Sequence, residues 1–142
     1  MDTIDINTFK PRREGNDSQF VSKESYCTHI CKNPGGKYVR QFVVDGEVFP
    51  KGKPPQRCDY LILNDTDRTA YYIELKGSDI PVAIAQIDST RSLISHSIKD
   101  YTYCCRIILH KVRSHQINDD FVIRWKRKHH AIIIQRQCTD IL

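Results

Sequence analysis

The amino-acid sequence predicts an α/β fold in which helices flank a mixed central sheet. Two segments, 18–31 and 80–98, repeat apolar residues at helical spacing, and short runs rich in Tyr, Ile, Val and Leu between turn residues are typical of strands. Their order, a helix, several antiparallel strands, a helix and a strand, describes an α/β sandwich. With 142 residues, 39% of them hydrophobic and 27% charged, the chain can form an independent core.

The N-terminal segment differs from the rest in being polar and locally basic. Lys10, Arg12 and Arg13 surround Pro11, and no apolar pattern there would pack on a core. We therefore expect a flexible basic arm over residues 1–17 and a single domain over residues 18–142.

The first helix is expected to begin at Ser18, behind a cap formed by Asp17 and Ser18. The breaker Asn-Pro-Gly-Gly over 33–36 must end it. One face of this helix would carry the positions i, i+4, i+7 and i+11, which are Phe20, Glu24, Cys27 and Cys31.

The sheet is expected to begin after this breaker. Residues 37–44 alternate and contain strand-forming residues, and Asp45-Gly46 after them is a hairpin signal. A basic loop rich in proline then covers 50–57. A second hairpin follows, because the short Tyr-, Ile- and Leu-rich runs 58–63 and 70–75 are joined by a polar turn.

A long helix is expected over residues 80–98. Asp79 can cap it, and Pro81 is tolerated in its first turn. Its apolar stripe consists of Ile80, Ile84, Ile87, Ile94 and Ile98.

The C-terminal third is expected to complete the sheet. Residues 103–109 and 130–135 are apolar runs typical of buried strands. Between them, Asn118-Asp119-Asp120 can cap a short helix over Phe121 to Lys128, and a strand over 121–125 is the alternative.

Composition limits the classes of function. No apolar run approaches the roughly 20 residues of a membrane span, and the N-terminus has no signal-peptide character, so we expect a cytoplasmic protein without a membrane partner. The six cysteines are irregularly spaced and are expected to be free thiols. Cys27, His29 and Cys31 could offer zinc ligands, but no second ligand pair is visible nearby.

The net charge is +5, and its distribution matters more than its size, because clustered Lys and Arg side chains neutralise phosphates. A solvated basic face is the alternative interpretation. Two clusters are the candidates for binding nucleic acid: Lys51, Lys53 and Arg57 in the loop, and Arg124, Lys126, Arg127 and Lys128 near the C-terminus.

The candidate active site lies on the second hairpin. If the turn closes symmetrically between Thr66 and Asp67, Asp59 faces Glu74, and Lys76 shares the face of Glu74. Opposed carboxylates destabilise a sheet unless a positive charge lies between them, and their oxygens suit Mg²⁺ or Mn²⁺. An exposed polar face with a cross-strand ion pair is the alternative, but the apolar flanks of the hairpin argue for burial.

At these residues the sequence resembles the PD-(D/E)XK, or restriction-endonuclease-like, nuclease superfamily. The matching pattern is Asp59, a turn, and then Glu74-Leu75-Lys76 before a helix, within roughly residues 18–110. Cys58 stands where the family name has proline. The resemblance is nearest to members of the Holliday junction resolvase and RecB types, and it implies a restriction-endonuclease-like αβββαβ core.

The resemblance also implies roles for particular residues. Asp59, Glu74 and the Leu75 carbonyl would hold the metal, and Lys76 would orient or deprotonate the attacking water. Glu24 on the first helix and Gln86 on the second would be additional catalytic residues, with Thr90 standing where RecB-type members have a tyrosine.

The sequence therefore predicts an Mg²⁺- or Mn²⁺-dependent nuclease that hydrolyses phosphodiester bonds in DNA, as an endonuclease and a homodimer. RNA is the second choice of substrate. The competing hypothesis is a catalytically inactive module of the same fold that binds nucleic acid or a protein partner.

Overall fold

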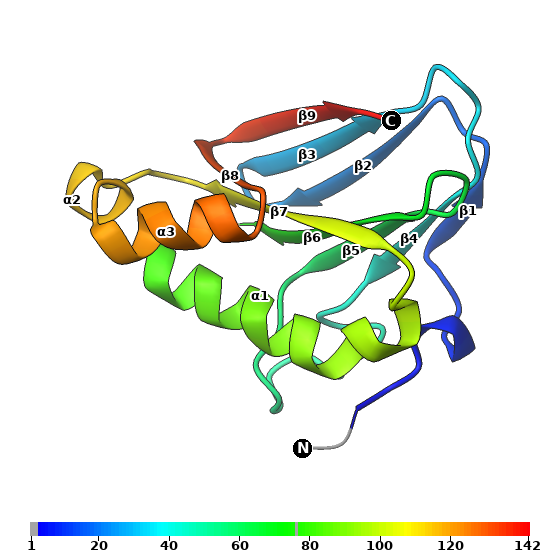
Figure 1. Cartoon of the computed structure of the whole chain (residues 1–142), viewed down its shortest axis with the longest axis horizontal. Helices are drawn as coiled ribbons and strands as arrows, with labels where there is room; N and C mark the ends of the chain where they lie inside the picture. The colour runs from blue at the N-terminus through cyan, green and yellow to red at the C-terminus, as the bar shows by residue number, and fades with distance from the viewer. Residues whose placement is uncertain (1–2, 76) are drawn as a thin grey trace.

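A mixed sheet forms the centre of the protein in the computed structural model, which describes residues 3–75 and 77–142 (Figure 1). In these residues its strand order is β1-β4-β5-β6-β7-β8. The first four strands in this order pair antiparallel, whereas β6, β7 and β8 are parallel neighbours. The bounds are Arg13–Gly15 for β1, Val39–Val43 for β4, Tyr60–Asn64 for β5, Thr69–Leu75 for β6, Thr102–Leu109 for β7 and Ala131–Gln135 for β8.

A smaller sheet covers one face of the main sheet, and helices cover the other (Figure 1). The small sheet has the order β2-β3-β9 in the described residues, with β9 parallel to β3. Its bounds are Gln19–Glu24, Cys27–Lys32 and Gln137–Ile141. The helices are α1 (Ile80–Ile94), α2 (Ser114–Ile117) and α3 (Asp120–Lys128), with short 3-10 helices η1 (Ile6–Thr8) and η2 (Ser95–Ile98). The protein is thus α/β with a mixed sheet, as predicted.

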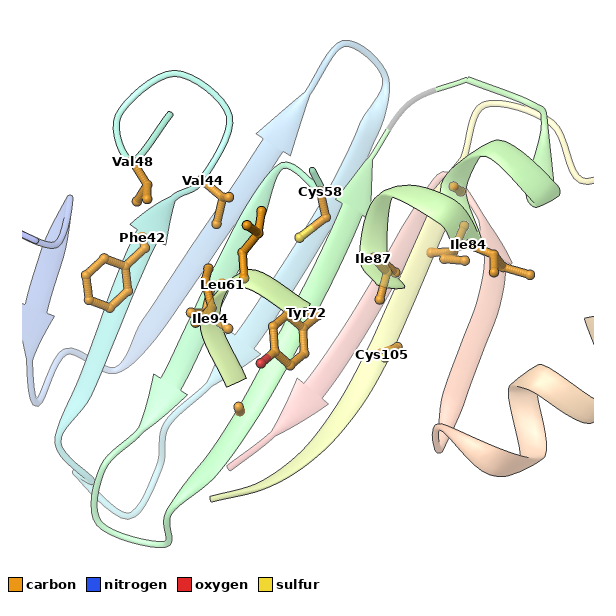
Figure 2. Close-up of a cluster of buried hydrophobic side chains, with 14 of the residues drawn as sticks. Phe42, Val44, Val48, Cys58, Leu61, Tyr72, Ile84, Ile87, Ile94 and Cys105 are labelled. Atoms are coloured by element: carbon orange, nitrogen blue, oxygen red, sulfur yellow. The ribbon is translucent and has the colours of Figure 1, made fainter. Parts of the chain in front are cut away.

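Two apolar cores follow from this layering. Alternate residues of β5 and β6 point to opposite faces, so Leu61 and Tyr72 pack towards α1 while Ile62 and Ile73 pack towards the small sheet. Figure 2 shows part of the first core, where Ile87 of α1 lies over the sheet. Both faces of the hairpin are therefore buried, which confirms the covered sheet expected from its apolar flanks.

The central elements agree with the sequence prediction. The second hairpin is formed by β5 and β6, and the expected long helix is α1 continued by η2. Asp79 caps α1, since its carboxylate accepts a hydrogen bond from the Val82 amide at 3.1 Å. Near the C-terminus, where a helix and a strand over 121–125 were the two alternatives, the structure has the helix α3, which Asp119 caps.

The helix predicted over residues 18–31 is wrong, and an antiparallel hairpin of β2 and β3 stands in its place. The spacing of Phe20, Cys27 and Cys31 fits both structures, because two strands joined by a two-residue turn also bring alternate residues to one face. Ser22 and His29, which lie outside the proposed helical stripe, are fully buried. The turn at Ser25 has a φ of +50°, which a helix cannot contain.

Two smaller expectations also need correction. The described part of the N-terminal arm is packed on the domain, since Ile6 is fully buried and β1 pairs with β4. The hairpin expected at Asp45-Gly46 is a tight turn closed by one isolated bridge between Asp45 and Phe49, because β4 already has β1 and β5 as neighbours.

Across residues 3–75 and 77–142, none of the helices has both the length and the apolar character that crossing a membrane requires.

Candidate metal and nucleic-acid site

The hairpin of β5 and β6 has the register on which the candidate site depends. Leu61 pairs with Tyr72, and Tyr60 pairs with Ile73, so that the numbers of paired residues have a constant sum. The next position in this register opposes Asp59 to Glu74. The predicted symmetric turn is therefore confirmed.

Asp59 is fixed where the ladder of β5 and β6 ends. Its backbone N–H donates to the Ile73 carbonyl at 3.1 Å, and its carboxylate Oδ2 accepts a hydrogen bond from the Leu75 N–H at 2.8 Å. Its carbonyl also accepts from the Val44 N–H at 2.8 Å. These bonds hold the Asp59 carboxylate against the backbone that follows Glu74.

Both carboxylates are buried. Asp59 is 5% exposed and Glu74 is 3% exposed, and each makes an interaction within the protein. The neighbouring Cys58 thiol responds to them: burial raises its pKa well above the usual value, and the charges of Glu74 and Asp59 raise it further. Cys58 therefore remains a neutral thiol and is not a candidate nucleophile.

The third residue of the predicted constellation, Lys76, lies outside the residues that the structure describes. The backbone of Leu75 is beside Asp59 through the hydrogen bond given above. Gly77, on the other side of Lys76, has a φ of +79° and accepts a hydrogen bond from the His110 N–H at 3.0 Å. The chain is thus anchored on both sides of this position.

Glu24 lies on a strand and not on the helix that the sequence predicted. It is the last residue of β2 and is half-buried, and its strand packs on the face of the main sheet opposite α1. Its neighbour Lys23 accepts a hydrogen bond from the Tyr60 hydroxyl at 3.2 Å, at the same end of β5 as Asp59. Glu24 and Asp59 therefore approach this end of the sheet from opposite sides.

Gln86 lies on α1, half-buried, beside the proline-rich loop. It lines a pocket of 290 Å³ together with Asp45 and residues 52–57. Thr90, one turn later, donates to the Gln86 carbonyl at 2.9 Å and accepts from the Cys58 N–H at 2.7 Å. This threonine joins α1 to the residue that precedes Asp59.

The basic loop contains two kinds of residue. Arg57 is 7% exposed and binds within the loop: its guanidinium lies 2.8 Å from Asp45 and donates to the Pro55 carbonyl at 2.6 Å. It organises the loop, which is a different role from the predicted contact with phosphate. Lys51 and Lys53 are exposed and available to a polyanion.

The second basic cluster lies on α3. Arg124, Arg127 and Lys128 are exposed, and Lys126 is half-buried, while Val122 and Trp125 face the core. Positive side chains in the last turn also stabilise the helix end, where the carbonyls carry partial negative charge. Charge on α3 therefore has a structural explanation besides binding to nucleic acid.

A buried ionic cluster that sequence analysis missed lies between the two sheets. Asp140 of β9 accepts two hydrogen bonds from Arg106 of β7, at 2.8 and 2.9 Å, and its Oδ2 lies 2.8 Å from His29 Nε2. Burial opposes ionisation, but the bonds from His29 and Arg106 lower the pKa of Asp140 well below its usual value. His29, Cys138 and Asp140 could also hold a metal by their spacing, but both Asp140 oxygens are already bound by Arg106. We interpret this cluster as the link between the sheets.

The six cysteines are free thiols, as expected. Comparisons of the chain with protein-family models, with curated proteins and with solved structures found no match.

Proposed function

We propose that the protein is a metal-dependent nuclease that hydrolyses phosphodiester bonds in DNA. The observation that carries the proposal is the pair of buried carboxylates, Asp59 and Glu74, opposed across one antiparallel hairpin. Two such groups repel each other, and a divalent cation between them would reduce this repulsion while it binds their oxygens.

The donor set fits a hard divalent cation. Asp59 and Glu74 offer carboxylate oxygens, and Mg²⁺ or Mn²⁺ takes one or two carboxylates together with waters and substrate phosphate. The Leu75 carbonyl would be a third protein ligand by the resemblance to PD-(D/E)XK nucleases. A cation bound there would act as a Lewis acid that polarises the scissile phosphate.

The residues of the chain have separate tasks in this proposal. The Leu75 N–H holds Asp59 Oδ2, so that one carboxylate keeps its orientation when substrate binds. Lys76 would accept a proton from the attacking water, or orient that water, and offset the negative charge of the transition state. Gln86 beside the loop pocket would contact a phosphate.

The order of elements also supports the resemblance in part. β4, β5 and β6, then α1 and β7, correspond to the βββαβ portion of the family core. The hairpin of β2 and β3 stands where that core has its first helix. We therefore propose a restriction-endonuclease-like core in which a β-hairpin replaces this helix, with a homodimer addressing the two DNA strands.

Cleavage of supercoiled and linear DNA with Mg²⁺ or Mn²⁺ tests the proposal. We expect Asp59→Asn and Lys76→Ala each to lower the cleavage rate by orders of magnitude. Asp100→Asn is the matched control, because Asp100 is an exposed carboxylate that pairs with Arg68 beside the turn of the hairpin, at the far end of β5 and β6. DNA binding without cleavage by the wild type under all of these conditions would favour the inactive module.

A further inference from the structure

A pair of exposed rings lies at the end of the main sheet that carries Asp59 and Glu74. Tyr26, in the turn between β2 and β3, is 77% exposed, and its ring centroid is 5.7 Å from that of His110, which follows β7. The exposed faces of these rings are available for a further flat group to stack on them.

Backbone hydrogen bonds hold the segments that carry both rings. The His110 N–H donates to the Gly77 carbonyl at 3.0 Å, which ties His110 to the chain three residues after Glu74. The turn that carries Tyr26 is held from its other side, since the Thr28 N–H donates to the Arg136 carbonyl at 2.9 Å. The rings are therefore presented on anchored backbone.

Two hollows flank the ring pair. One, of 340 Å³, is lined by Tyr26 and His110 with Ser25, Cys27, Gly77 and Ser78. The other, of 350 Å³, is lined by Tyr26, His110 and Arg136. Each is at the lower end of the volumes of small-ligand pockets, a size that suits one nucleobase or nucleotide.

Two arginines lie at these hollows. Arg136 is exposed, and within residues 3–75 and 77–142 it makes no ion pair with a carboxylate. Arg113 reaches the rim of the first hollow, where its guanidinium donates to the Ser78 hydroxyl at 3.1 Å. Aromatic rings beside arginines are the combination by which proteins stack unpaired bases and hold the adjoining phosphates.

We infer that Tyr26 and His110 form a stacking platform for an unpaired nucleobase, with Arg136 holding the adjacent phosphate. The inference rests on the proposed nuclease function and names its substrate class: DNA with a single-stranded segment next to the cleavage point, such as a tailed or branched duplex. A fully paired duplex keeps its bases stacked inside and offers none to the platform.

The test measures binding without cleavage, in EDTA, by fluorescence anisotropy of two labelled DNAs: a blunt duplex and the same duplex with a single-stranded tail. We expect Tyr26→Ala to weaken binding of the tailed DNA by about 5- to 150-fold per base unstacked, with little effect on the blunt duplex. Tyr26→Phe should bind as the wild type does, because stacking needs the ring and not the hydroxyl.

Tyr38→Ala is the matched control, since Tyr38 is also exposed but its hydroxyl donates to Glu14 at 3.0 Å and it lies beside the turn at the other end of the hairpin. Equal affinity of wild type and Tyr26→Ala for the tailed DNA, or equal losses on both DNAs, would overturn the platform. If the wild type cleaved no DNA with any cation but Tyr26→Ala still lost affinity for the tail, the platform would stand and the nuclease proposal would fail.

Discussion

At the scale of single residues, the sign of the neighbouring charge separates the buried side chains that support structure from those available for chemistry. Arg57 and Arg106 are both nearly buried and both bind carboxylates, Asp45 and Asp140, so each stabilises a loop or a sheet contact. Asp59 and Glu74 are equally buried, yet they are like charges. Buried like charges are unusual unless a cation or another group binds between them, which is why this pair is the candidate site.

The link between the sheets predicts an acid-sensitive stability. Asp140→Asn should lower the free energy of unfolding by about 3–5 kcal/mol at pH 7, because the buried Arg106 loses its charged partner. The pKa of Asp140 is lowered in the folded state, so its contribution is complete above the unfolded value near 3.9 and is lost as the pH falls towards the folded value.

Urea unfolding of the wild type and of Asp140→Asn at a series of pH values measures this contribution. The difference between the two proteins should shrink below about pH 4. Asp17→Asn, which removes the partner of the surface residue Arg13, is the control and should change stability little. A difference that is the same at pH 3 and pH 7 would show that ionisation of Asp140 is not involved.

At the scale of elements, the sequence predicted best where a pattern admits one structure only. The hairpin of β5 and β6 has apolar residues on both faces and a symmetric turn, so one register satisfies both cores. The segment of β2 and β3 is different, because its apolar residues fit both the spacing of a helix and the alternation of two strands joined at Ser25. Burial of Ser22 and His29 distinguishes them, and this burial depends on distant elements: the Ser22 hydroxyl accepts a hydrogen bond from Gln41 of β4 at 3.0 Å, and His29 Nε2 lies 2.8 Å from Asp140 of β9.

Contact between α1 and the segment just before β5 predicts a stability effect at one hydroxyl. Thr90→Val keeps the shape of the side chain but leaves the buried Cys58 N–H without its acceptor, and we expect a loss of about 1–3 kcal/mol in the free energy of unfolding. Ser92→Ala is the control, since its exposed hydroxyl binds only the Asp88 carbonyl on the same helix. If Thr90→Val and the wild type were equally stable in urea unfolding, this hydrogen bond would not stabilise the segment around Asp59.

At the scale of the whole molecule, the two sheets and the helices bring distant segments to one end of the main sheet. The turn of β2 and β3, the end of β6 and the residue after β7 lie together there, and Asp59, just before β5, is held against the end of β6 by the Leu75 N–H. The sequence could indicate Asp59 and Glu74, which lie on one hairpin. It could not indicate Tyr26 beside His110, because their contact depends on the small sheet and on no local pattern.

The charge on α3 predicts a salt-dependent contact with DNA. Neutralising its basic cluster should reduce the slope of log affinity against log salt concentration by about 0.9 for each phosphate contact removed. A double variant of the exposed residues Lys32 and Lys99 is the control. An unchanged slope, with the helix intact by circular dichroism, would leave only the helix-stabilising role for the cluster, which consists of Arg124, Lys126, Arg127 and Lys128.

The most direct test of the carboxylate site is the melting temperature of the wild type, Asp59→Asn and Lys76→Ala, with and without Mn²⁺. A cation that binds only the folded protein stabilises it by about 2.7 kcal/mol at a hundredfold excess over Kd. The wild type should therefore melt higher with Mn²⁺, Asp59→Asn should lose this response, and Lys76→Ala should keep it because it removes no ligand. If millimolar Mn²⁺ left the wild-type melting temperature unchanged, or raised that of Asp59→Asn equally, Asp59 and Glu74 would not be a metal site.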